Sequence, residues 1–486
     1  MGSRQVSTNV PVAEYWQGKR VTVAGLGVSG VPAARVLHGL GARITVVNDG
    51  DDDRARAQAA ELEAEGITVR LGDGDTLPDG TELIVTAPGW RPDKPLFAAA
   101  DAAGVPVWGD VELAWRLRGL GGRKPAPWLA VTGTNGKTTT VRMLASILEA
   151  AGLRTAAVGN IGVSLLDAVL GDEEYDVLAV ELSSYQLHWA PSLRAHSAAV
   201  LNLAPDHLDW HGSMEAYAAD KGRVYEGNTV ACVYNAADKA TEDLVREADV
   251  EEGCRAIGFT LGTPGPSQVG VVEDLLVDRA FVENRQKQAQ ELAQVSDVQP
   301  PAPHNIANAL AAAALARAFG VEPSAVRDGL RAFRPEPHRI EYVEEVAGVS
   351  YVDDSKATNT HAAEASLAAY DPIVWIAGGL AKGATFDELV QKSAARLRGA
   401  VLIGADRALI REALARHAPQ VPVVDLDRTD TGAMAAAVQE AERLAQPGDT
   451  VLLAPACASM DMFVNYNKRG EAFADAVRSL AAERDA

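Results

Sequence analysis

Cysteine, basic residues and long apolar runs are all scarce in this chain of 486 residues. Its three cysteines, Cys232, Cys254 and Cys457, form no Cys-x-x-Cys pair, and this low count suits a reducing compartment better than a disulfide framework. No apolar run approaches the roughly 18 residues that a membrane span requires, and the N-terminal residues 1–16 contain no apolar segment typical of a secretory signal. We therefore expect a cytoplasmic protein with no membrane partner.

Basic side chains are outnumbered, with 45 Lys and Arg against 66 Asp and Glu, so that the formal net charge is −21. A charge of this sign argues against non-specific binding to nucleic acids or to anionic membranes. If the ligands are phosphates, positive charge has to be concentrated locally against the field of the whole chain. The hydrophobic content of 47% is typical of a soluble globular protein.

The length predicts two to four domains, since one domain usually takes about 100–200 residues. Short β-branched runs alternate with helical patterns along most of the chain, which is typical of parallel, doubly wound α/β sheets. We expect three consecutive domains: a Rossmann-like domain over 1–120, a central P-loop mononucleotide-binding domain over 121–335 and a second Rossmann-like domain over 336–486. The Gly- and Pro-rich stretch 260–303 is expected to form a hairpin and surface loops.

The strongest motif is a glycine-rich loop between the apolar stretch 128–131 and a helical pattern. The loop residues are Gly133, Thr134, Asn135, Gly136, Lys137, Thr138 and Thr139. Glycines let backbone N–H groups surround a phosphate, and the helix N-terminus adds partial positive charge. Lys137 would neutralise the β- and γ-phosphates, and the Thr138 hydroxyl would bind Mg²⁺. Val131 stands where the usual P-loop has its first glycine, so this is a shortened variant.

A second glycine turn, Gly25-Leu26-Gly27-Val28-Ser29-Gly30, follows the first apolar run. The spacing G-x-G-x-x-G is used to seat a dinucleotide pyrophosphate at a helix N-terminus, and Asp49 follows at the distance where an acidic residue meets a ribose or a base. The alternative is that these glycines only permit close packing of strand and helix. The pattern favours a nucleotide but does not single out NAD.

Further polar residues follow predicted strands, where the ligand crevice of an open α/β sheet lies. Glu181 and the pair Asp206-His207 end two strands of the second domain, as expected beside a metal–nucleotide complex. Singly, Glu181 is more often a salt-bridge partner, and Lys221 would be a solvated helical lysine. The third domain has three comparable segments, namely 337–339, 353–359 and 454–470.

Nine short patterns now resemble the Mur ligase family over nearly the whole chain, in the family's order. They are TGTNGKT, NIG, ELSSYQL, DHLDWHG, KGRVY, HNIANA, PHRIE, DDSKATNT and APACASMDMF. The resemblance implies an ATP-dependent ligase of peptidoglycan precursor synthesis that adds D-glutamate to UDP-N-acetylmuramoyl-L-alanine through an acyl phosphate. It also implies ATP and two Mg²⁺ ions as cofactors, and we expect a monomer.

The resemblance further implies a role for each matching residue. Catalysis is assigned to Lys137, His207, Lys221, Arg339 and Lys382. Metal ligands would be Thr138 and Glu181 for one Mg²⁺, and His207 with a carbamylated Lys221 for the other. Besides the phosphate loop, ATP would contact Asn305, Asn308, Arg339, Asp354 and Lys356. The UDP-linked substrate would contact Val28, Ser29, Asp49, Gly89, Asn160 and His207. D-glutamate would contact Thr358, Lys382, Ser459 and Tyr466.

Three other interpretations stay open on the residues. A dinucleotide-dependent oxidoreductase would explain 25–30 but leaves the phosphate loop unexplained. A non-enzymatic nucleotide switch leaves the strand-end metal ligands and the third domain's polar residues unexplained. Another amino-acid-adding ligase, such as an L-alanine-adding Mur enzyme or a folylpolyglutamate synthase, would usually differ at ELSSYQL.

Overall fold

The computed structural model describes residues 13–428, 430 and 432–485. The chain divides into two compact units, one comprising the described residues up to 298 together with 307–333, and the other 299–306 together with the described residues from 334 onward. Within the described residues, no helix combines the length and the apolar character needed to cross a membrane. Most of the stretch on which the absence of a secretory signal was argued, residues 1–12, lies outside the described part.

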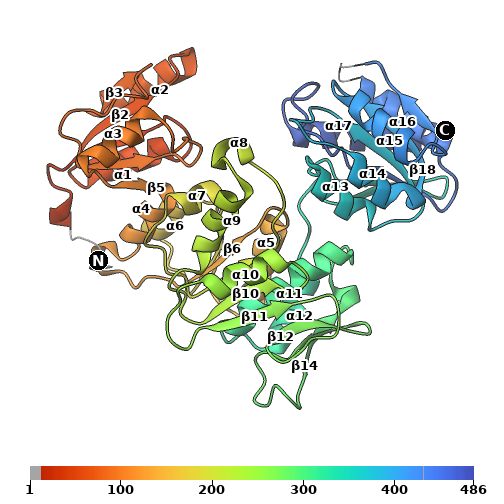
Figure 1. Cartoon of the computed structure of the whole chain (residues 1–486), viewed down its shortest axis with the longest axis horizontal. Helices are drawn as coiled ribbons and strands as arrows, with labels where there is room; N and C mark the ends of the chain where they lie inside the picture. The colour runs from red at the N-terminus through yellow and green to blue at the C-terminus, as the bar shows by residue number, and fades with distance from the viewer. Residues whose placement is uncertain (1–12, 429, 431, 486) are drawn as a thin grey trace. The chain divides into compact units, whose positions relative to one another are not determined.

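The first sheet of the first unit, in red and orange in Figure 1, has five strands, all parallel, in the order β3-β2-β1-β4-β5. Its strands are β1 (Arg20–Ala24), β2 (Arg43–Asn48), β3 (Thr68–Leu71), β4 (Leu83–Thr86) and β5 (Val107–Gly109), and its helices are α1 (Gly30–Gly39), α2 (Asp53–Ala64), α3 (Pro95–Ala103) and α4 (Asp110–Leu117). The buried strands are continuous apolar runs because helices cover a parallel sheet on both faces. The sequence predicts all five strands, as the short runs 20–27, 42–49, 66–73, 82–89 and 105–110.

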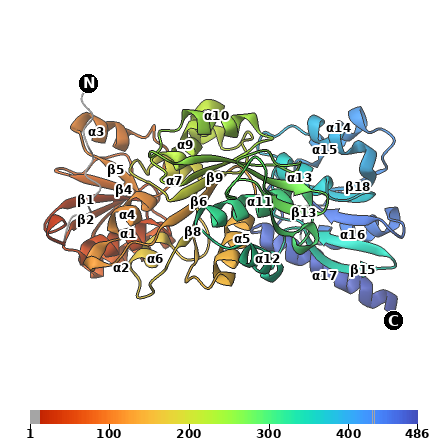
Figure 2. The ribbon, with the colours of Figure 1, turned by 90° about the horizontal axis from the view of Figure 1, so that it is seen from below.

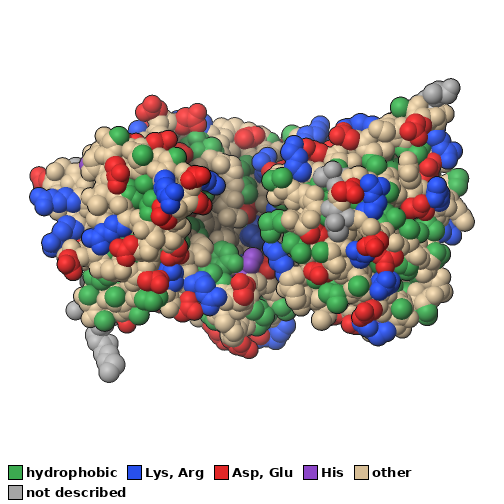
Figure 3. All heavy atoms as spheres, turned by 90° about the horizontal axis from the view of Figure 1, so that it is seen from above, with side chains coloured by type: hydrophobic (Ala, Val, Ile, Leu, Met, Phe, Trp, Pro, Cys, Tyr) green, Lys and Arg blue, Asp and Glu red, His purple; other side chains and the backbone are tan. Residues whose placement is uncertain are grey.

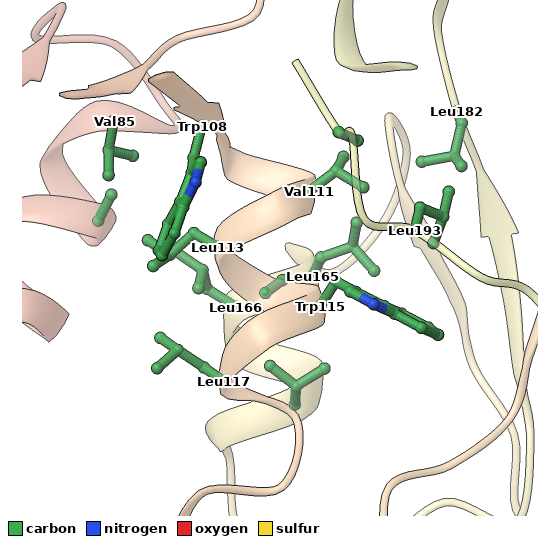
Figure 4. Close-up of a cluster of buried hydrophobic side chains, with 14 of the residues drawn as sticks. Val85, Trp108, Val111, Leu113, Trp115, Leu117, Leu165, Leu166, Leu182 and Leu193 are labelled. Carbon is green, nitrogen blue, oxygen red and sulfur yellow. The ribbon is translucent and has the colours of Figure 1, made fainter. Parts of the chain in front are cut away.

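Helix α4 links this sheet to the rest of the first unit. Figure 4 shows it between Val85 of β4 on one side and Leu182 and Leu193 on the other, with Trp115 directed toward the latter. Leu182 and Leu193 are 0–1% exposed, so the two sheets of this unit share one hydrophobic core.

The second sheet has nine strands in the order β14-β13-β12-β11-β10-β9-β6-β8-β7. They are β6 (Trp128–Thr132), β7 (Ala157–Gly159), β8 (Leu178–Glu181), β9 (Ser197–Val200), β10 (Ala231–Asn235), β11 (Arg255–Phe259), β12 (Gln268–Val272), β13 (Leu275–Asp278) and β14 (Gln290–Gln294). The pairing is parallel from β7 to β12 and antiparallel from β12 to β14. The stretch expected as a hairpin and loops therefore contributes three strands. The sequence predicts the other strands of this sheet as the runs 128–131, 155–160, 175–184 and 196–204, and it misses β10 and β11.

Eight helices of the described residues accompany this sheet: α5 (Lys137–Ala150), α6 (Leu165–Leu170), α7 (Ser184–His188), α8 (Leu208–His211), α9 (Met214–Gly222), α10 (Lys239–Glu247), α11 (Pro303–Ala318) and α12 (Pro323–Ala332). Helix α12 packs closely on α5, since the Ser146 hydroxyl donates to the Gly329 carbonyl at 2.8 Å. The first turn of α11 is grouped with the second unit and the rest of the helix with the first.

The third sheet belongs to the second unit and has six strands in the order β15-β16-β20-β17-β18-β19. They are β15 (Glu341–Val346), β16 (Val349–Asp353), β17 (Ile373–Gly378), β18 (Leu397–Ile403), β19 (Val423–Asp425) and β20 (Thr450–Leu453), and only the β15–β16 pair is antiparallel. The helices are α13 (Thr360–Leu367), α14 (Asp387–Ser393), α15 (Arg407–His417), α16 (Ala433–Leu444) and α17 (Tyr466–Asp485). Separate apolar clusters cover the two faces, one with α13–α15 and the other with α16 and α17. Figure 2 shows α14 and α15 on one side of β18 and α16 and α17 on the other.

The predicted fold class, three successive α/β sheets, is confirmed. The exact domain boundaries stay predictions, although the second compact unit resumes at Arg334, next to the expected boundary at 335. Acidic and basic side chains alternate over the face in Figure 3, so the negative net charge does not form one continuous acidic surface there.

Candidate active site

The phosphate loop lies between the carboxyl end of β6 and the first turn of α5. Gly136 has φ +84, and a Cβ on it would lie 2.4 Å from Asn308 Oδ1. The Asn135 N–H donates to Asn202 Oδ1 at 2.9 Å, and the Thr134 and Tyr217 hydroxyls lie 2.9 Å apart. The loop is thus held in shape by groups from three other segments, and glycine is required at 136 both for φ and for space.

Two lysines converge on this loop. Lys137 Nζ donates to the Gly133 and Thr134 carbonyls at 2.9 and 3.0 Å. Lys221, from the end of α9, donates to the same Gly133 carbonyl at 2.9 Å and is only 2% exposed. Burial, and then the nearby charge of Lys137, hold the pKa of the Lys221 amine well below its usual value. The structure thus makes Lys221 a buried amine, and the solvated helical lysine considered from the sequence alone is excluded.

Glu181, the last residue of β8, is 2% exposed. Its Oε1 accepts a hydrogen bond from Asn160 Nδ2 at 3.0 Å, whereas its buried Oε2 has no hydrogen-bond partner among the described residues. A buried carboxylate oxygen without a partner is costly unless a cation compensates it. The surroundings of Glu181 therefore fit a metal ligand. Thr138, which is 7% exposed, is the second residue of the neighbouring helix α5.

His207 lies between β9 and α8 with φ +54. Burial is the largest of the causes that lower the pKa of its imidazole, and the charges of Lys137 and Lys221 lower it further. A neutral imidazole is the form that binds metal ions. The structure therefore brings His207, Lys221 and Lys137 to the same region of the first unit.

A hydrogen-bonded chain of buried groups that the sequence did not reveal supports α9. His211 Nε2 lies 2.9 Å from Ser184 Oγ, and His211 Nδ1 lies 3.0 Å from Asp220 Oδ2. Asp220 is also bonded to His188 Nδ1 at 2.9 Å. Although this is the order of a Ser-His-Asp triad, Ser184 is 2% exposed and the His211 side chain 0%. The chain is therefore structural, and it fixes the helix that carries Lys221. Sequence spacing gave no signal for it, because its members come from three separate helices, α7, α8 and α9.

The glycine turn of the first sheet is tightly packed. A Cβ at Gly30 would lie 1.9 Å from the Gly25 carbonyl oxygen, and one at Gly25 would lie 2.8 Å from Trp90 Nε1. These distances support the alternative interpretation from the sequence, in which the glycines permit close packing of strand and helix. The same turn leaves Val28 88% exposed at its tip.

Lys94 is a residue of this region that the sequence analysis missed. Its Nζ lies 2.9 Å from Asp49 Oδ1 and 2.8 Å from Asp75 Oδ1, and 5.1 Å from the centre of the Trp90 ring. Because it lies 45 residues from Asp49 in sequence, no local pattern could have linked the two.

The remaining residues assigned to the UDP-linked substrate occupy three positions in the first unit. Ser29 donates to Asp110 Oδ2 at 3.1 Å beside the glycine turn. The Gly89 carbonyl accepts from Trp210 Nε1 at 3.2 Å, near His207 in sequence. Asn160 is bonded to Glu181, as above. The set thus runs from the first sheet to the metal-ligand region. Only Val28 and Ser29 belong to the turn itself, and Asp49 directly follows β2.

In the second unit, three of the four residues assigned to D-glutamate, Thr358, Lys382 and Ser459, lie on loops joined by backbone hydrogen bonds, and the fourth begins α17. Leu380 and Ala458 exchange two bonds of 2.9 Å, which connects the loop of Lys382 to that of Ser459. The Ala456 N–H donates to the Ala357 carbonyl at 2.9 Å, next to Thr358. The fourth residue, Tyr466, lies with its ring 3.9 Å from Lys356 Nζ.

Of the residues assigned to nucleotide binding in the second unit, Asp354 and Lys356 follow β16, Arg339 precedes β15, and Asn305 lies in the first turn of α11. Asp354 is 7% exposed, and burial raises its pKa to about 6, while a hydrogen bond from the Ser366 hydroxyl acts in the opposite direction. Arg339 lies close enough to lower that pKa by its charge, and its Nε is 3.1 Å from Glu336. Asn305 donates to the Pro300 carbonyl at 3.3 Å in this unit, whereas Asn308 lies against the phosphate loop in the first.

Comparisons with known proteins support the resemblance to the Mur ligase family. Residues 131–316 match the Mur ligase middle domain, and residues 338–457 match the family described as Mur ligase, glutamate ligase domain. A relative from Streptomyces coelicolor, named UDP-N-acetylmuramoylalanine–D-glutamate ligase, is 86% identical over 96% of this chain and 99% of its own. The chain belongs to the Mur ligase family. A Thermobifida fusca relative of the same name is 61% identical to this Mur ligase over 96% and 99% of the two chains.

Solved structures of the family share the fold of this Mur ligase. MurC from Thermotoga maritima, a UDP-N-acetylmuramate-alanine ligase, superimposes with a TM-score of 0.53 at 18% identity, covering 95% of this chain and 99% of its own. MurF from Acinetobacter baumannii gives 0.57 at 17% identity, covering 96% and 92%. The three-domain α/β architecture is therefore that of the family. The names of the relatives at 86% and 61% identity favour the ligase interpretation over the oxidoreductase and the switch.

Proposed function

We propose that this Mur ligase forms an amide bond between the terminal carboxylate of UDP-N-acetylmuramoyl-L-alanine and the amine of D-glutamate, at the expense of ATP. Mur ligases are ATP-dependent, with Mg²⁺ as a general family feature. The relatives at 86% and 61% identity carry the name of this reaction. The supporting observation in the structure is the convergence of Lys137 and Lys221 on one carbonyl of the phosphate loop.

The reaction must bring an anionic carboxylate to an anionic triphosphate. The carboxylate oxygen attacks the γ-phosphorus and ADP leaves; the amine then attacks the acyl carbon, and the tetrahedral intermediate expels phosphate. Lys137 would neutralise the phosphate oxygens during the first step, and Arg339 would contact the transferred phosphate. Mg²⁺, when bound, supplies charge compensation for the phosphates.

Two Mg²⁺ ions are part of this proposal. Thr138 and Glu181 would hold the first, and the unpartnered Oε2 of Glu181 supports this assignment. His207 and Lys221 would hold the second, with Lys221 carbamylated. Carbamate formation needs a neutral amine, which attacks CO₂ and releases a proton, and the lowered pKa of Lys221 favours that form. The product is an anionic oxygen ligand of the kind that Mg²⁺ prefers.

The substrate contacts follow the chemistry of each segment. Val28, Ser29 and Asp49 would hold the uridine diphosphate at the glycine turn, with Gly89, Asn160 and His207 further along. Lys382 would bind a carboxylate of D-glutamate, framed by Thr358, Ser459 and Tyr466. Asn305, Asn308, Asp354 and Lys356 would contact the adenosine and phosphates. We propose further that the protein works as a monomer in the cytoplasm.

The experiment is ADP release measured with UDP-N-acetylmuramoyl-L-alanine and Mg²⁺, with D-glutamate, L-glutamate, L-alanine or meso-diaminopimelate as the amine. We expect turnover with D-glutamate alone, and turnover with another amine instead would overturn the substrate assignment. Lys137→Ala should lower kcat by at least about 10²-fold, since removal of one preorganised charged donor has effects of this order. Lys239→Ala, an exposed lysine on α10, is the matched control and should keep wild-type turnover.

A further inference from the structure

Two of the three cysteines lie side by side in the first unit. Cys232 Sγ, on β10, is 3.9 Å from Cys254 Sγ, immediately before β11. The strands are parallel, and Cys232 pairs with Ala256, two residues beyond Cys254. Because residues two apart in an extended chain point to the same face, the register itself places both thiols on one side of the sheet.

The two thiols differ in access and in acidity. Cys232 is 2% exposed, whereas Cys254 is partly exposed. The hydrogen bond with Cys232, together with one from the Arg255 N–H, lowers the pKa of Cys254, although partial burial opposes this. The same contact with Cys254, and then burial, raises the pKa of Cys232. Cys254 is therefore the accessible thiol with more thiolate character, and its neighbour is protected from solvent.

We propose that Cys254 and Cys232 form an oxidation site that takes hydroperoxides and closes to an internal disulfide. The Cys254 thiol loses its proton, and the thiolate attacks the distal peroxide oxygen. The O–O bond breaks, and the leaving oxygen takes up that proton, so that Cys254 sulfenic acid and water (or an alcohol) are formed. The Cys232 sulfur then attacks the sulfenic sulfur, the S–S bond forms, and a second water leaves with the Cys232 proton. The peroxide gains the two electrons that the dithiol loses.

The local structure permits the small movement that bond formation requires. The sulfur atoms have to approach by about 2 Å to reach the length of a disulfide. Cys254 ends a turn in which its N–H donates to the Glu251 carbonyl at 3.0 Å and Gly253 has φ +92. This turn precedes the strand, so Cys254 can shift without breaking the ladder of β11.

The disulfide would enclose the crossover that supports the phosphate loop. Asn235 Nδ2 donates to the Leu201 carbonyl at 3.1 Å, and Asp238 Oδ2 accepts from the Leu203 N–H at 2.8 Å. Asn202 lies between Leu201 and Leu203, and its Oδ1 accepts a hydrogen bond from the Asn135 N–H of the phosphate loop. Oxidation should therefore slow amide hydrogen exchange in the peptides between the two cysteines.

The test treats the reduced full-length protein with hydrogen peroxide, quenches it in acid denaturant, and alkylates the remaining thiols before mass spectrometry. We expect the loss of two hydrogens, one cross-linked peptide joining Cys232 to Cys254, and a single alkylated thiol at Cys457. Cys457 is the internal reference, because burial raises its thiol pKa to about 12 and it lies in the other unit.

Single variants separate the two roles. Cys232→Ser should stop at a Cys254 sulfenic acid that dimedone traps, Cys254→Ser should keep both remaining thiols, and Cys457→Ser should form the disulfide as the wild type does. The proposal is overturned if the wild-type protein keeps two alkylatable thiols at 232 and 254 after peroxide, or if Cys457 is oxidised first. Failure here leaves the ligase assignment untouched, since ADP release is not part of the readout.

Discussion

Lys137 and Lys221 donate to the same carbonyl, but only one of them could be recognised as a site residue from the sequence pattern alone. Lys137 could be predicted from the spacing of the phosphate loop, because the loop, its glycines and the helix start are consecutive. Lys221 could be assigned only through the family resemblance, since a lysine in a helix gives no sign of burial. Its 2% exposure results from α9 packing beside β6, which joins residues 88 positions apart.

Asp354 is the residue whose charge should affect stability most clearly. Its pKa of about 6 lies above the ordinary 3.8, so the native state holds the proton more tightly than the unfolded chain. The stabilisation is then fully present below the unfolded pKa and lost as the pH rises through 6, a difference of up to about 3 kcal/mol. Asp354→Asn should raise the unfolding midpoint above that of the wild type at pH 8, and this difference should vanish near pH 4.

Scanning calorimetry at the two pH values measures this effect. Asp475→Asn, an exposed carboxylate of the same unit, serves as the control and should change the free energy of unfolding by less than about 0.5 kcal/mol at either pH. An equal midpoint difference for Asp354→Asn at both pH values would contradict the assignment. The same variant should raise the KM for ATP, because Asp354 is proposed to hold the nucleotide.

At the scale of elements, most strands that contain a run of apolar or β-branched residues are predicted from the sequence, whereas β10, β11 and β15 are not. β1, β4 and β6 are buried apolar runs bounded by glycine or proline turns. β15 carries three glutamates in six residues and lies at an edge of the third sheet, where polar side chains meet solvent. β10 is short and includes Cys, Tyr and Asn, so its place in the sheet comes from its neighbours rather than from its own pattern.

The contact between α5 and α12 depends on a glycine. A Cβ at Gly329 would lie 2.4 Å from the Ile147 Cα, which is a backbone atom that cannot move aside alone. Gly329→Ala should therefore destabilise the first unit by about 1–3 kcal/mol in urea unfolding, despite the higher helix propensity of alanine. Gly39→Ala, at the end of α1 with no atom within 4 Å of the added Cβ, is the matched control and should not destabilise. Equal effects of the two substitutions would show that the packing at 329 is not limiting.

For the whole molecule, the sequence could order the sheets and place most site residues on loops after strands. It could not show which side chains are brought together by the fold, such as Lys94 with Asp49 or His211 with Asp220, because those pairs have no fixed spacing. The grouping of 299–306 with the second unit was equally hidden, since α11 is one uninterrupted helix. Long-range pairing of this kind is set by packing and is absent from local pattern.

The division into two compact units, each with its own buried core, leads to a final prediction for the intact chain. Thermal unfolding should show two transitions, because units with separate cores need not unfold together. Gly329→Ala should lower the transition of the first unit, and Asp354→Asn at pH 8 should raise that of the second. Since the phosphate loop lies in the first unit, a non-hydrolysable ATP analogue with Mg²⁺ should raise the first transition by mass action, by about 2.7 kcal/mol at 100 times its Kd, and Lys137→Ala should abolish that shift. A single transition that both variants displace in the same way would contradict the independence of the two cores.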